Sequence, residues 1–546
     1  MPAGRLRHFI LATFALVFLS ACAPVHPAGG TTATPAPAPT ASPMPAPSLT
    51  PTADLAALWI DPDLPAAFRD SLDLPEAVVV AQNRDLADYQ ITWQTADAAG
   101  TDWVYALAAP FATLTDEVSS QSVQAAWKGE AAEPFDGAGL MMTAETAAAL
   151  RGLWGEFDPA SVHIVPAEDL VDSAWAQRPG WVIVPFDELT PRLKVIQVDG
   201  LSPLDPELDV RKYPLRAVIG VTTAEGSPLA ETDLSIQWVG NRRPEHIARV
   251  FMTGTTAMVR HMALRMEEEG VLYPTEKIGS LLRSADVTHI SNEVALYSNC
   301  PPAKPLRGSL RFCTSPTYVQ MLEAVGADVI ELTGNHLLDW GAAAISETLK
   351  LYESEGFQVY GGGWSLESAR RPLRMEINGN KLAFIGCNPS GPEAVWVTAE
   401  RPGAAPCDYD WMEAQIRDLH QAGFLPIVTI QHIEVYDYKP TSAQRVISER
   451  MARAGAALIS GSQSHFPQGF AFVGDTLVHY GLGNTFFDQM DFGSSRGFLD
   501  RSVFYEGRLI STEVFTIRLE DYAQPRLMTP EERTALLEKI FTKGGW

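Results

Sequence analysis

The sequence has 546 residues, of which 46% are hydrophobic and 20% are charged. This is the composition of an ordinary globular protein, and the length predicts two or three domains. Acidic residues outnumber basic ones by 66 to 41, so the formal net charge at pH 7 is −25. That charge argues against a nucleic-acid partner and against a polybasic membrane-binding patch. A polyanionic partner would need a cation or a local basic groove to mediate the contact.

The N-terminus has the pattern of a bacterial lipoprotein signal peptide. Arg5 and Arg7 precede an apolar stretch of the length of a signal-peptide h-region, which ends in the sequence LSAC at Cys22. This ending resembles a lipobox, in which the cysteine becomes the lipidated first residue after cleavage; the alternative is an ordinary signal peptide with a chance cysteine. We predict that residues 1–22 are a lipoprotein signal peptide. Acyl chains on Cys22 would then anchor the protein on the extracytoplasmic side of a bacterial membrane, at the cell surface or in the periplasm.

The next segment, residues 23–53, is dominated by Pro, Ala, Thr and Ser and shows no apolar periodicity. Such a segment cannot bury enough apolar surface to fold, and its prolines keep it extended. We therefore predict a disordered tether that lifts the folded part of the protein off the membrane. No later segment of the sequence is long and apolar enough to predict a transmembrane helix.

Four further cysteines are candidates for disulfide bonds, because an even number of cysteines in an exported chain is typical of disulfides. The near pairs are Cys300 with Cys313 and Cys387 with Cys407. The sequence leaves the other two connectivities open. The spacings do not resemble those of a zinc knuckle, which argues against a cysteine metal site.

Residues 54–240 alternate predicted strands and helices, which indicates an α/β domain. Residues 102–129 predict a strand, a proline turn and a helix that begins at Thr115. The later segments VIVPFDEL, KVIQVDG and YPL continue this alternation of strands and helices. Together these segments resemble the type-II periplasmic solute-binding fold, of the kind seen in phosphate- and molybdate-binding proteins. No ligand fingerprint is visible, and the free amides of the predicted helix start at Thr113 to Thr115 are the candidate anion site.

Residues 246–520 repeat a rhythm of apolar strand, polar turn and helix. In parallel α/β sheets the carboxyl ends of the strands gather at one edge, so the polar residues that end these strands predict a clustered site. Asn335 has an alternative, purely structural role as the cap of the following helix. A single His at such a turn would more often have a structural role, but three His residues together with Glu and Asn favour a clustered functional site. The residues at the strand ends are Asn292, Glu293, Asn335, His336, His432, Glu434, Gln463, His465, Asn484 and Asp488.

Several of these turns form an ordered set of motifs. In chain order the motifs are GTTAMVR at Gly254, SNEVAL with Glu293, GNHLLDWG with Asn335, His336, Asp339 and Gly341, QHIEVY with His432, SGSQSHFPQG with Gln463 and His465, and GLGNTFFDQ with Gly483 and Asn484. The set resembles the CapA family of capsule (poly-γ-glutamate) synthesis proteins, which have the calcineurin-like metallophosphoesterase fold. This resemblance implies a four-layer α/β sandwich for residues 246–520, and we expect a helical tail at residues 521–546.

The resemblance also implies a metal-dependent active site. In that fold two divalent ions share a bridging carboxylate, whose place is taken here by Glu293, and His336 with Asp339 would form the catalytic pair, with His336 as proton donor. Two of the family's ligands are replaced in this sequence. Thr255 stands in place of the first-strand Asp, and Gln463 stands in place of the first His of the Gly-x-His-x-His turn.

These replacements reduce the expected metal content. One ion would keep only Glu293 and His465 as ligands, whereas the other would keep Glu293, Asn335 and His432, with Gln463 as a weak oxygen ligand. Because a neutral hydroxyl does not supply the charge that a divalent cation needs, we expect at most one ion, of Mn, Zn or Fe. The ion should depend more on His432 than on His465.

Two functions of different class follow. The first is a surface-anchored hydrolase or transferase in capsule or poly-γ-glutamate (exopolymer) biosynthesis, acting on a phosphate ester or a γ-glutamyl-type amide with one metal ion. The second is a non-catalytic envelope binding or assembly factor that uses the same fold as a platform. In either case the expected partners are the membrane, through the lipid on Cys22, and an anionic capsule polymer or its synthesis machinery, with no nucleic acid.

Overall fold

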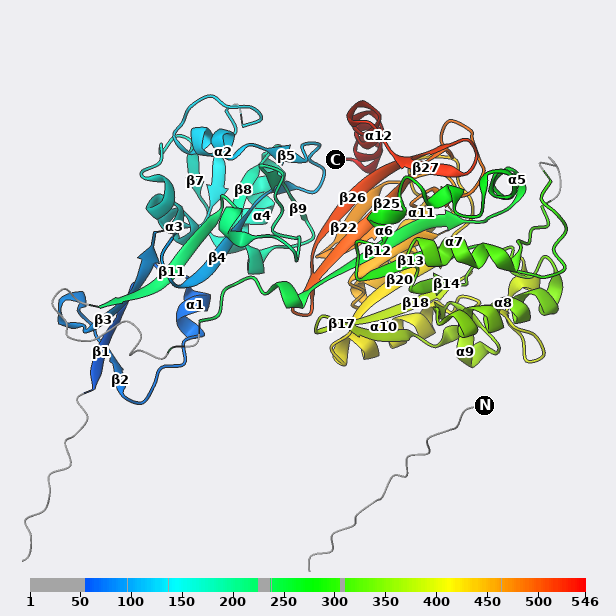
Figure 1. Cartoon of the computed structure of the whole chain (residues 1–546), viewed down its shortest axis with the longest axis horizontal. Helices are drawn as coiled ribbons and strands as arrows, with labels where there is room; N and C mark the ends of the chain where they lie inside the picture. The colour runs from blue at the N-terminus through cyan, green and yellow to red at the C-terminus, as the bar shows by residue number, and fades with distance from the viewer. Residues whose placement is uncertain are drawn as a thin grey trace, which may run out of the picture. The chain divides into compact units, whose positions relative to one another are not determined.

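The computed structural model of the chain describes residues 55–95, 97–135, 137–223, 236, 238–304, 310–462 and 464–546 (Figure 1). Leu55–Trp546 form one compact unit. The predicted signal peptide with Cys22, the predicted tether and Gln463 lie outside the described residues. Within the described ranges, no helix combines the length and the apolar character needed to cross a bilayer.

The N-terminal domain is built on a mixed sheet with the strand order β2-β1-β3-β11-β4-β8-β6-β7, and β9 also pairs with β4. The long strand β4 joins two halves of this sheet, because Thr101–Val104 pair with β11 and Tyr105–Pro110 pair with β8 and β9. The strands are β1 (Ala56–Ile60), β2 (Val78–Val80), β3 (Tyr89–Gln94), β4 (Thr101–Pro110), β6 (Leu140–Met142), β7 (Val162–Ile164), β8 (Trp181–Pro185), β9 (Leu193–Val195) and β11 (Arg216–Thr223). The helices are α1 (Ala66–Asp70), α2 (Ser120–Trp127), α3 (Ala144–Trp154) and α4 (Ala167–Ala176).

The predicted helix start at Thr115 is wrong. The chain instead forms a loop and a short strand, β5 (Glu117–Val118), which pairs with β10 (Gln197–Val198), and helix α2 begins at Ser120 behind the capping side chain of Ser119. The loop is held by Lys194, whose ammonium donates to the carbonyl oxygens of Thr113 and Leu114 at 2.9 and 3.4 Å. Because its carbonyls are engaged by a cation and no helix begins there, this loop is not the anion site that the sequence suggested.

The C-terminal domain contains two facing sheets. The first has the order β15-β14-β13-β12-β25-β26-β27, with β24 beside β12, and the second has the order β17-β18-β20-β21-β23-β22. Its first-sheet strands are β12 (Ile247–Thr256), β13 (Val287–Asn292), β14 (Val329–Glu331), β15 (Gln358–Tyr360), β24 (Asn484–Phe486), β25 (Arg496–Tyr505), β26 (Arg508–Glu520) and β27 (Gln524–Leu527). Its second-sheet strands are β17 (Leu373–Ile377), β18 (Asn380–Cys387), β20 (Leu425–Gln431), β21 (Leu458–Ser462), β22 (Phe470–Val473) and β23 (Thr476–His479).

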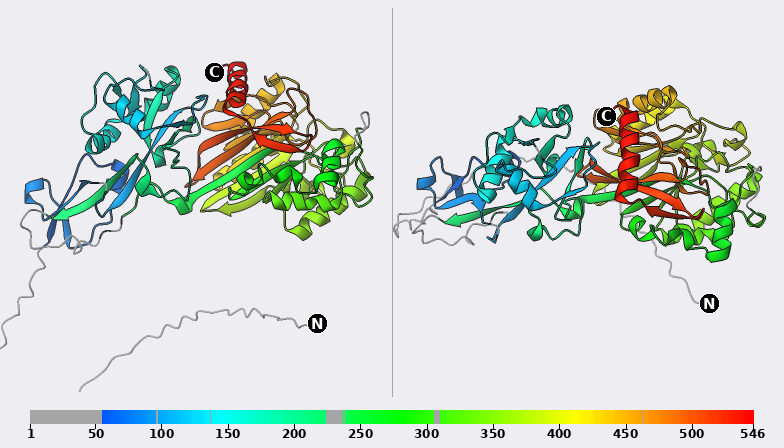
Figure 2. Two further views of the ribbon diagram at one scale, coloured as in Figure 1. Left: turned by 45° about the horizontal axis from the view of Figure 1, so that its top comes forward. Right: turned by 90° about the horizontal axis from the view of Figure 1, so that it is seen from above.

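Alternation of side chains along these strands produces a four-layer arrangement. In β12, Val250 and Met252 point between the sheets and contact a core that includes Phe384 and Ile427, whereas Phe251 points to the other face and packs among helical residues such as Met262. The outer face of the second sheet is covered by α10 and α11. The prediction of a four-layer α/β sandwich is therefore confirmed, and Figure 2 shows it from two further directions. The main helices are α5 (Arg260–Glu269), α6 (Gly279–Leu282), α7 (Val319–Ala324), α8 (Gly341–Glu355), α9 (Leu366–Arg370), α10 (Tyr409–Gln421), α11 (Ser442–Arg453) and α12 (Pro530–Gly544).

The end of the chain differs from the predicted helical tail at residues 521–546. Residues Gln524–Leu527 form β27, which extends the first sheet by pairing with β26, and only Pro530–Gly544 form a helix. Helix α12 has a capping box at Thr529 and a buried face that includes Leu537 and Phe541. Because β26 would otherwise be an open edge, the segment before the helix is drawn into the sheet.

The two cysteine pairs that are near in sequence are bonded in the structure. Cys300 is joined to Cys313 with a Cα–Cα distance of 5.8 Å, and Cys387 is joined to Cys407 with a Cα–Cα distance of 5.0 Å. Cys387 ends β18 and is buried against α10. The first bridge closes a loop that ends next to Phe312, a residue that belongs to the candidate site.

Candidate metal site at the strand ends

The candidate site lies where the carboxyl ends of the parallel strands of the two sheets meet. The backbone N–H of Glu293, just after β13, donates to the carbonyl oxygen of Thr256 at the end of β12 at 3.0 Å. The turn after β14 packs directly on Glu293: a Cβ atom on Gly334 would lie 2.5 Å from the Cα atom of Glu293. This close approach, which only glycine permits, and a backbone bridge between Val294 and His336 bring Asn335 and His336 beside Glu293.

Asn335 does not cap the following helix. Helix α8 begins at Gly341 behind Trp340, and its first turn receives no side-chain capping bond. The Oδ1 atom of Asn335 is instead buried without a hydrogen-bond partner among the described residues. The capping explanation for this residue is therefore wrong, and its amide oxygen is available to a ligand.

Further buried oxygens without a partner surround it. Both carboxylate oxygens of Glu293, a side chain that is 2% exposed, lack a hydrogen-bond partner in the described part of the chain. Burying polar atoms in this way is costly unless something satisfies them. A cation or a proton placed among these oxygens would remove that cost. The unpartnered atoms at these strand ends are Thr255 Oγ1, Thr256 Oγ1, Asn292 Oδ1, Glu293 Oε1 and Oε2, Glu331 Oε2 and Asn335 Oδ1.

His465 faces the same carboxylate. Its Nδ1 atom lies 2.7 Å from Oδ1 of Asn484, whose amide nitrogen is already committed to Gln489 and Ser494. Asn484 therefore accepts the hydrogen bond, which assigns the proton of a neutral His465 ring to Nδ1 and leaves a lone pair on Nε2. Nε2 lies 3.9 Å from Oε1 of Glu293 and also 3.9 Å from Oε1 of Glu434.

These distances suit a shared cation. Two donor atoms that each lie about 2.0–2.2 Å from one ion are separated by at most about 4.4 Å. A lone pair that faces two carboxylates across 3.9 Å is repelled by them unless a positive charge lies between. The donors are carboxylate, imidazole and amide groups, all of which are ligands of divalent cations.

His432 is the next residue after β20 and is 9% exposed. Burial lowers the pKa of His432 to about 4, so its imidazole is neutral at physiological pH. A neutral imidazole is the form that can bind a metal ion. Its position after β20 places it at the same edge as the loop of His465, because β20 and β21 run parallel, with Gln431 beside Ser462.

His336 forms a pair with Asp339. The Nδ1 atom of His336 lies 2.7 Å from Oδ2 of Asp339, and the same oxygen accepts a hydrogen bond from the backbone N–H of Phe312 at 2.7 Å. Burial alone would lower the pKa of His336, but the hydrogen bond with Asp339 and the negative charge of Glu293 outweigh it, and the pKa is raised. His336 thus holds a proton more readily than an ordinary histidine, as a general acid must.

The ring of His336 is covered by a residue from the disulfide-closed loop. The ring centroids of Phe312 and His336 are 4.5 Å apart. The guanidinium of Arg260 lies 5.2 Å from the centroid of the Phe312 ring and donates a hydrogen bond to the buried carboxylate of Asp488. The sequence did not predict these contacts, because residues 260, 312, 336 and 488 are brought together only by the tertiary fold. Arg260 supplies the positive charge that partly opposes the raised pKa of His336.

A buried carboxyl group, Glu331, links the loops beneath the site. Its Oε1 atom accepts hydrogen bonds from the hydroxyls of Thr333 at 2.6 Å and Ser462 at 2.8 Å. Thr333 precedes the Asn335 turn, and its hydroxyl lies 3.3 Å from Oε1 of Gln431, the neighbour of His432. Burial raises the pKa of Glu331, and the two hydroxyl donors oppose that rise. The sequence offered one signal for this residue, a charged side chain at the end of an otherwise apolar strand.

The residues fit part of a coordination shell for one ion and do not fit two. Across the described ranges, no three or more His, Cys, Asp or Glu side chains form a group that could hold a metal ion. Thr255 supplies a hydroxyl in place of a carboxylate. An ion at Glu293 and His465 would therefore depend on Asn335, Thr255 or other neutral oxygens to complete its shell.

The fold and the position of these residues define the class of protein: a four-layer α/β sandwich with its candidate site at the strand ends. Residues 249–489 match the model of a family described as "Bacterial capsule synthesis protein PGA_cap". All the candidate residues at the strand ends lie inside this range. The predicted resemblance to CapA proteins is confirmed over this part of the chain.

Two curated relatives show the extent of the similarity. The chain is 25% identical over 243 residues to the Capsule biosynthesis protein CapA of Bacillus anthracis, covering 44% of this chain and 59% of that protein. It is 23% identical over 239 residues to the PGA biosynthesis protein CapA of Bacillus subtilis, covering 43% of this chain and 62% of that protein. The chain thus spans about three fifths of the length of these relatives.

Solved structures resemble parts of the chain. The 5'-nucleotidase precursor from Thermus thermophilus is 15% identical, with a TM-score of 0.33, and covers 55% of this chain and 58% of its own. An ABC-type phosphate transport receptor from Vibrio cholerae is 13% identical, with a TM-score of 0.23, and covers 27% of this chain and 71% of its own.

Proposed function

We propose that the protein is a bacterial envelope protein of capsule or poly-γ-glutamate (exopolymer) biosynthesis, anchored through a lipid on Cys22, with a divalent-cation site centred on Glu293. The family match over residues 249–489 supports the biosynthetic role. The observation that carries the cation site is the buried carboxylate of Glu293, with neither oxygen hydrogen-bonded in the described part of the chain and with the Nε2 lone pair of His465 3.9 Å away.

The site supports hydrolysis or transfer on a phosphate ester or a γ-glutamyl-type amide. A bound Mn, Zn or Fe ion would supply Lewis-acid polarisation of the substrate. Glu293, Asn335 and His465 would hold the ion, and Asn484 fixes the tautomer of His465. His336 would deliver a proton to the leaving atom, while Asp339 orients its ring and stabilises its protonated form. Phe312, whose ring packs at a tilt against the ring of His336, would limit the access of water to that proton.

A second candidate function is a non-catalytic binding or assembly platform for an anionic capsule polymer or its synthesis machinery. Thr255 favours this reading, because the first strand of the site ends in a neutral hydroxyl. The lack of any group of three or more ionisable or thiol ligands in the described ranges supports it as well. In this case Glu293 would be satisfied by a proton or by a neighbouring imidazolium.

Hydrolysis of two chromogenic substrates distinguishes the two functions. The full-length chain would be assayed on p-nitrophenyl phosphate and on γ-glutamyl-p-nitroanilide, with and without added Mn, Zn or Fe. We expect metal-dependent release of product from one of the two. His336→Ala should reduce kcat by roughly 10²–10⁴-fold, the usual contribution of a general acid, and leave the metal content unchanged.

The matched control is His163→Ala, since His163 is an exposed residue of β7 in the N-terminal domain. This variant should retain full activity. If the wild-type chain releases no product from either substrate with any of the ions, the enzymatic proposal fails and the binding platform stands. Equal rates for His336→Ala and the wild type would remove His336 from the mechanism.

A further inference from the structure

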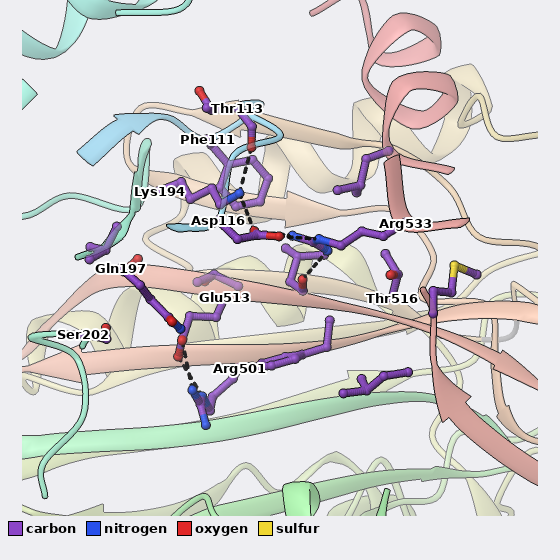
Figure 3. Close-up of a pocket in the computed structure, with 18 of the residues that line it drawn as sticks. Phe111, Thr113, Asp116, Lys194, Gln197, Ser202, Arg501, Glu513, Thr516 and Arg533 are labelled. Atoms are coloured by element: carbon purple, nitrogen blue, oxygen red, sulfur yellow. Dashed lines mark hydrogen bonds and ion pairs between the residues drawn. The ribbon is translucent and has the colours of Figure 1, made fainter. Parts of the chain in front are cut away.

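The N-terminal and C-terminal parts of the compact unit Leu55–Trp546 line a cavity of about 310 Å³ (Figure 3). None of the residues that line it belongs to the strand-end site. One wall is formed by the loop after β4 together with β9 and β10, the floor is formed by β25 and β26, and helix α12 closes the far side. The volume is at the lower end of the range of pockets that hold small molecules, about 300–1,000 Å³, and domain interfaces are a common place for such pockets.

Three cations and two carboxylates line this cavity. Asp116 accepts hydrogen bonds from Nε and Nη2 of Arg533, both at 2.8 Å, and forms an ion pair with Lys194 at 2.6 Å (Figure 3). Glu513 accepts two hydrogen bonds from Arg501, at 2.7 and 2.9 Å. The cavity therefore has one more positive than negative charge, in a chain whose formal net charge is −25.

Both guanidinium groups have N–H donors that form no hydrogen bond with the described residues. Arg533 uses three of its five N–H groups, two on Asp116 and one on the carbonyl oxygen of Val514. Arg501 likewise uses three, two on Glu513 and one on the hydroxyl of Ser284. Two N–H groups on each side chain have no partner in the described part of the chain, and an incoming anion could accept from them.

A hydroxyl in the floor of the cavity also lacks a partner. Ser511 is 1% exposed, and its Oγ atom forms no hydrogen bond with any described residue. Buried hydroxyls are rarely left unpaired, so a ligand or a water molecule is needed to satisfy this one. Ser511 lines the cavity together with Arg501 and Arg533.

The rest of the lining is mostly apolar. Helix α12 contributes Leu537 and Phe541, which are 2% and 7% exposed, and the loop after β4 contributes Phe111, which is 3% exposed. Phe515 and Met528 complete this wall. A ligand for such a cavity needs an apolar body for the wall and an anionic group for the guanidiniums and the hydroxyl.

We propose that this cavity is a binding site for a small organic carboxylate with an apolar body. The carboxylate accepts hydrogen bonds from the free N–H groups of Arg501 and Arg533 and from the hydroxyl of Ser511, while the apolar body lies against Leu537, Phe541 and their neighbours. Both domains line the site, so an occupied cavity adds contacts between them. This proposal is independent of metal binding at Glu293.

The test is a calorimetric titration of the full-length chain with phenylacetate, using phenylacetamide as the neutral probe of the same shape. We expect saturable binding of one phenylacetate per chain and at least tenfold weaker binding of phenylacetamide. Ser511→Leu fills the space and removes the hydroxyl, and should weaken phenylacetate binding at least tenfold. Raising the salt concentration should weaken binding of the acid and leave binding of the amide unchanged.

A second variant tests the proposal independently of whether Ser511→Leu folds. The double change Arg501→Gln and Glu513→Gln replaces an ion pair by two amides that can bond to each other, and should abolish the preference for the acid over the amide. The control, Arg371→Gln with Glu367→Gln, alters an exposed ion pair of helix α9 and should bind like the wild type. Absence of saturable binding in the folded wild-type chain would overturn the proposal. Equal affinities for acid and amide, or normal binding by Ser511→Leu, would do so as well.

Discussion

Replacement of Glu331 by leucine should destabilise the protein much more than replacement by glutamine. In Glu331→Leu the hydroxyls of Thr333 and Ser462, which now donate at 2.6 and 2.8 Å, lose their buried acceptor. Each buried polar group left unsatisfied costs about 1–3 kcal/mol. Thr333 keeps a weaker contact with Gln431 at 3.3 Å, so we expect a total loss of about 2–4 kcal/mol.

Glu331→Gln is the matched control, because its side-chain carbonyl oxygen can accept both hydrogen bonds. Its cost should stay below about 1.5 kcal/mol, the size of one ordinary hydrogen bond. The assay is urea unfolding of both variants beside the wild type, followed by circular dichroism. A second readout is the affinity for Mn, which should fall in the leucine variant because the loops of Asn335 and His465 lose their common support. Equal losses for the two variants, or a loss below about 0.5 kcal/mol for leucine, would refute the role assigned to Glu331.

Three further predictions concern the disulfide near the site, the partly buried Lys194 and the membrane anchor. Removing the Cys300–Cys313 bridge with a double serine variant should cost roughly 3 kcal/mol, as a 13-residue separation implies, and thermal melting with and without reductant measures it. Burial lowers the pKa of Lys194 to about 8, so the folded state binds this proton less tightly than the unfolded state does. The free energy of unfolding should therefore rise between about pH 8 and about pH 10.5 because of Lys194. Urea unfolding across that range should show this rise in the wild type and not in Lys194→Met. Cys22→Ser should move the protein from the membrane fraction to the soluble fraction, and recovery of the variant in salt-washed membranes would contradict lipid anchoring.

The strand-end pattern was enough to predict the architecture and the residues gathered at its edge. Apolar runs that stop at Glu293 and Asn335 indicated parallel strands, and the structure has β13 and β14 ending there. The packing of the two turns could not be predicted, because it depends on the close approach of Gly334 to Glu293. Whether Asn335 capped a helix was likewise decided only by where α8 begins.

Elements that depend on distant contacts were the ones that sequence patterns missed. The loop at Thr113 to Thr115 was predicted as a helix start from its local residues, but the partly buried Lys194 of β9 donates to its carbonyl oxygens. The strand Gln524–Leu527 contains a proline and two polar residues, so its pattern gave no strand signal, and it forms because β26 offers an edge. The weight given to His432 over His465 rested on family motifs. That ranking stays a prediction, and the structure adds that His465 faces Glu293, with its tautomer fixed by Asn484.

The measurement that tests the central claim most directly is the metal content of the full-length chain after dialysis against Mn or Zn, determined by elemental analysis. We predict one ion per chain in the wild type, none in Glu293→Gln, and at least tenfold weaker binding in His465→Ala, while the exposed His163→Ala retains the ion. Two ions per chain would contradict the one-ion site and restore a two-metal enzyme. No bound ion in the wild type, or an ion that survives Glu293→Gln, would show that the buried carboxylate is not a metal ligand.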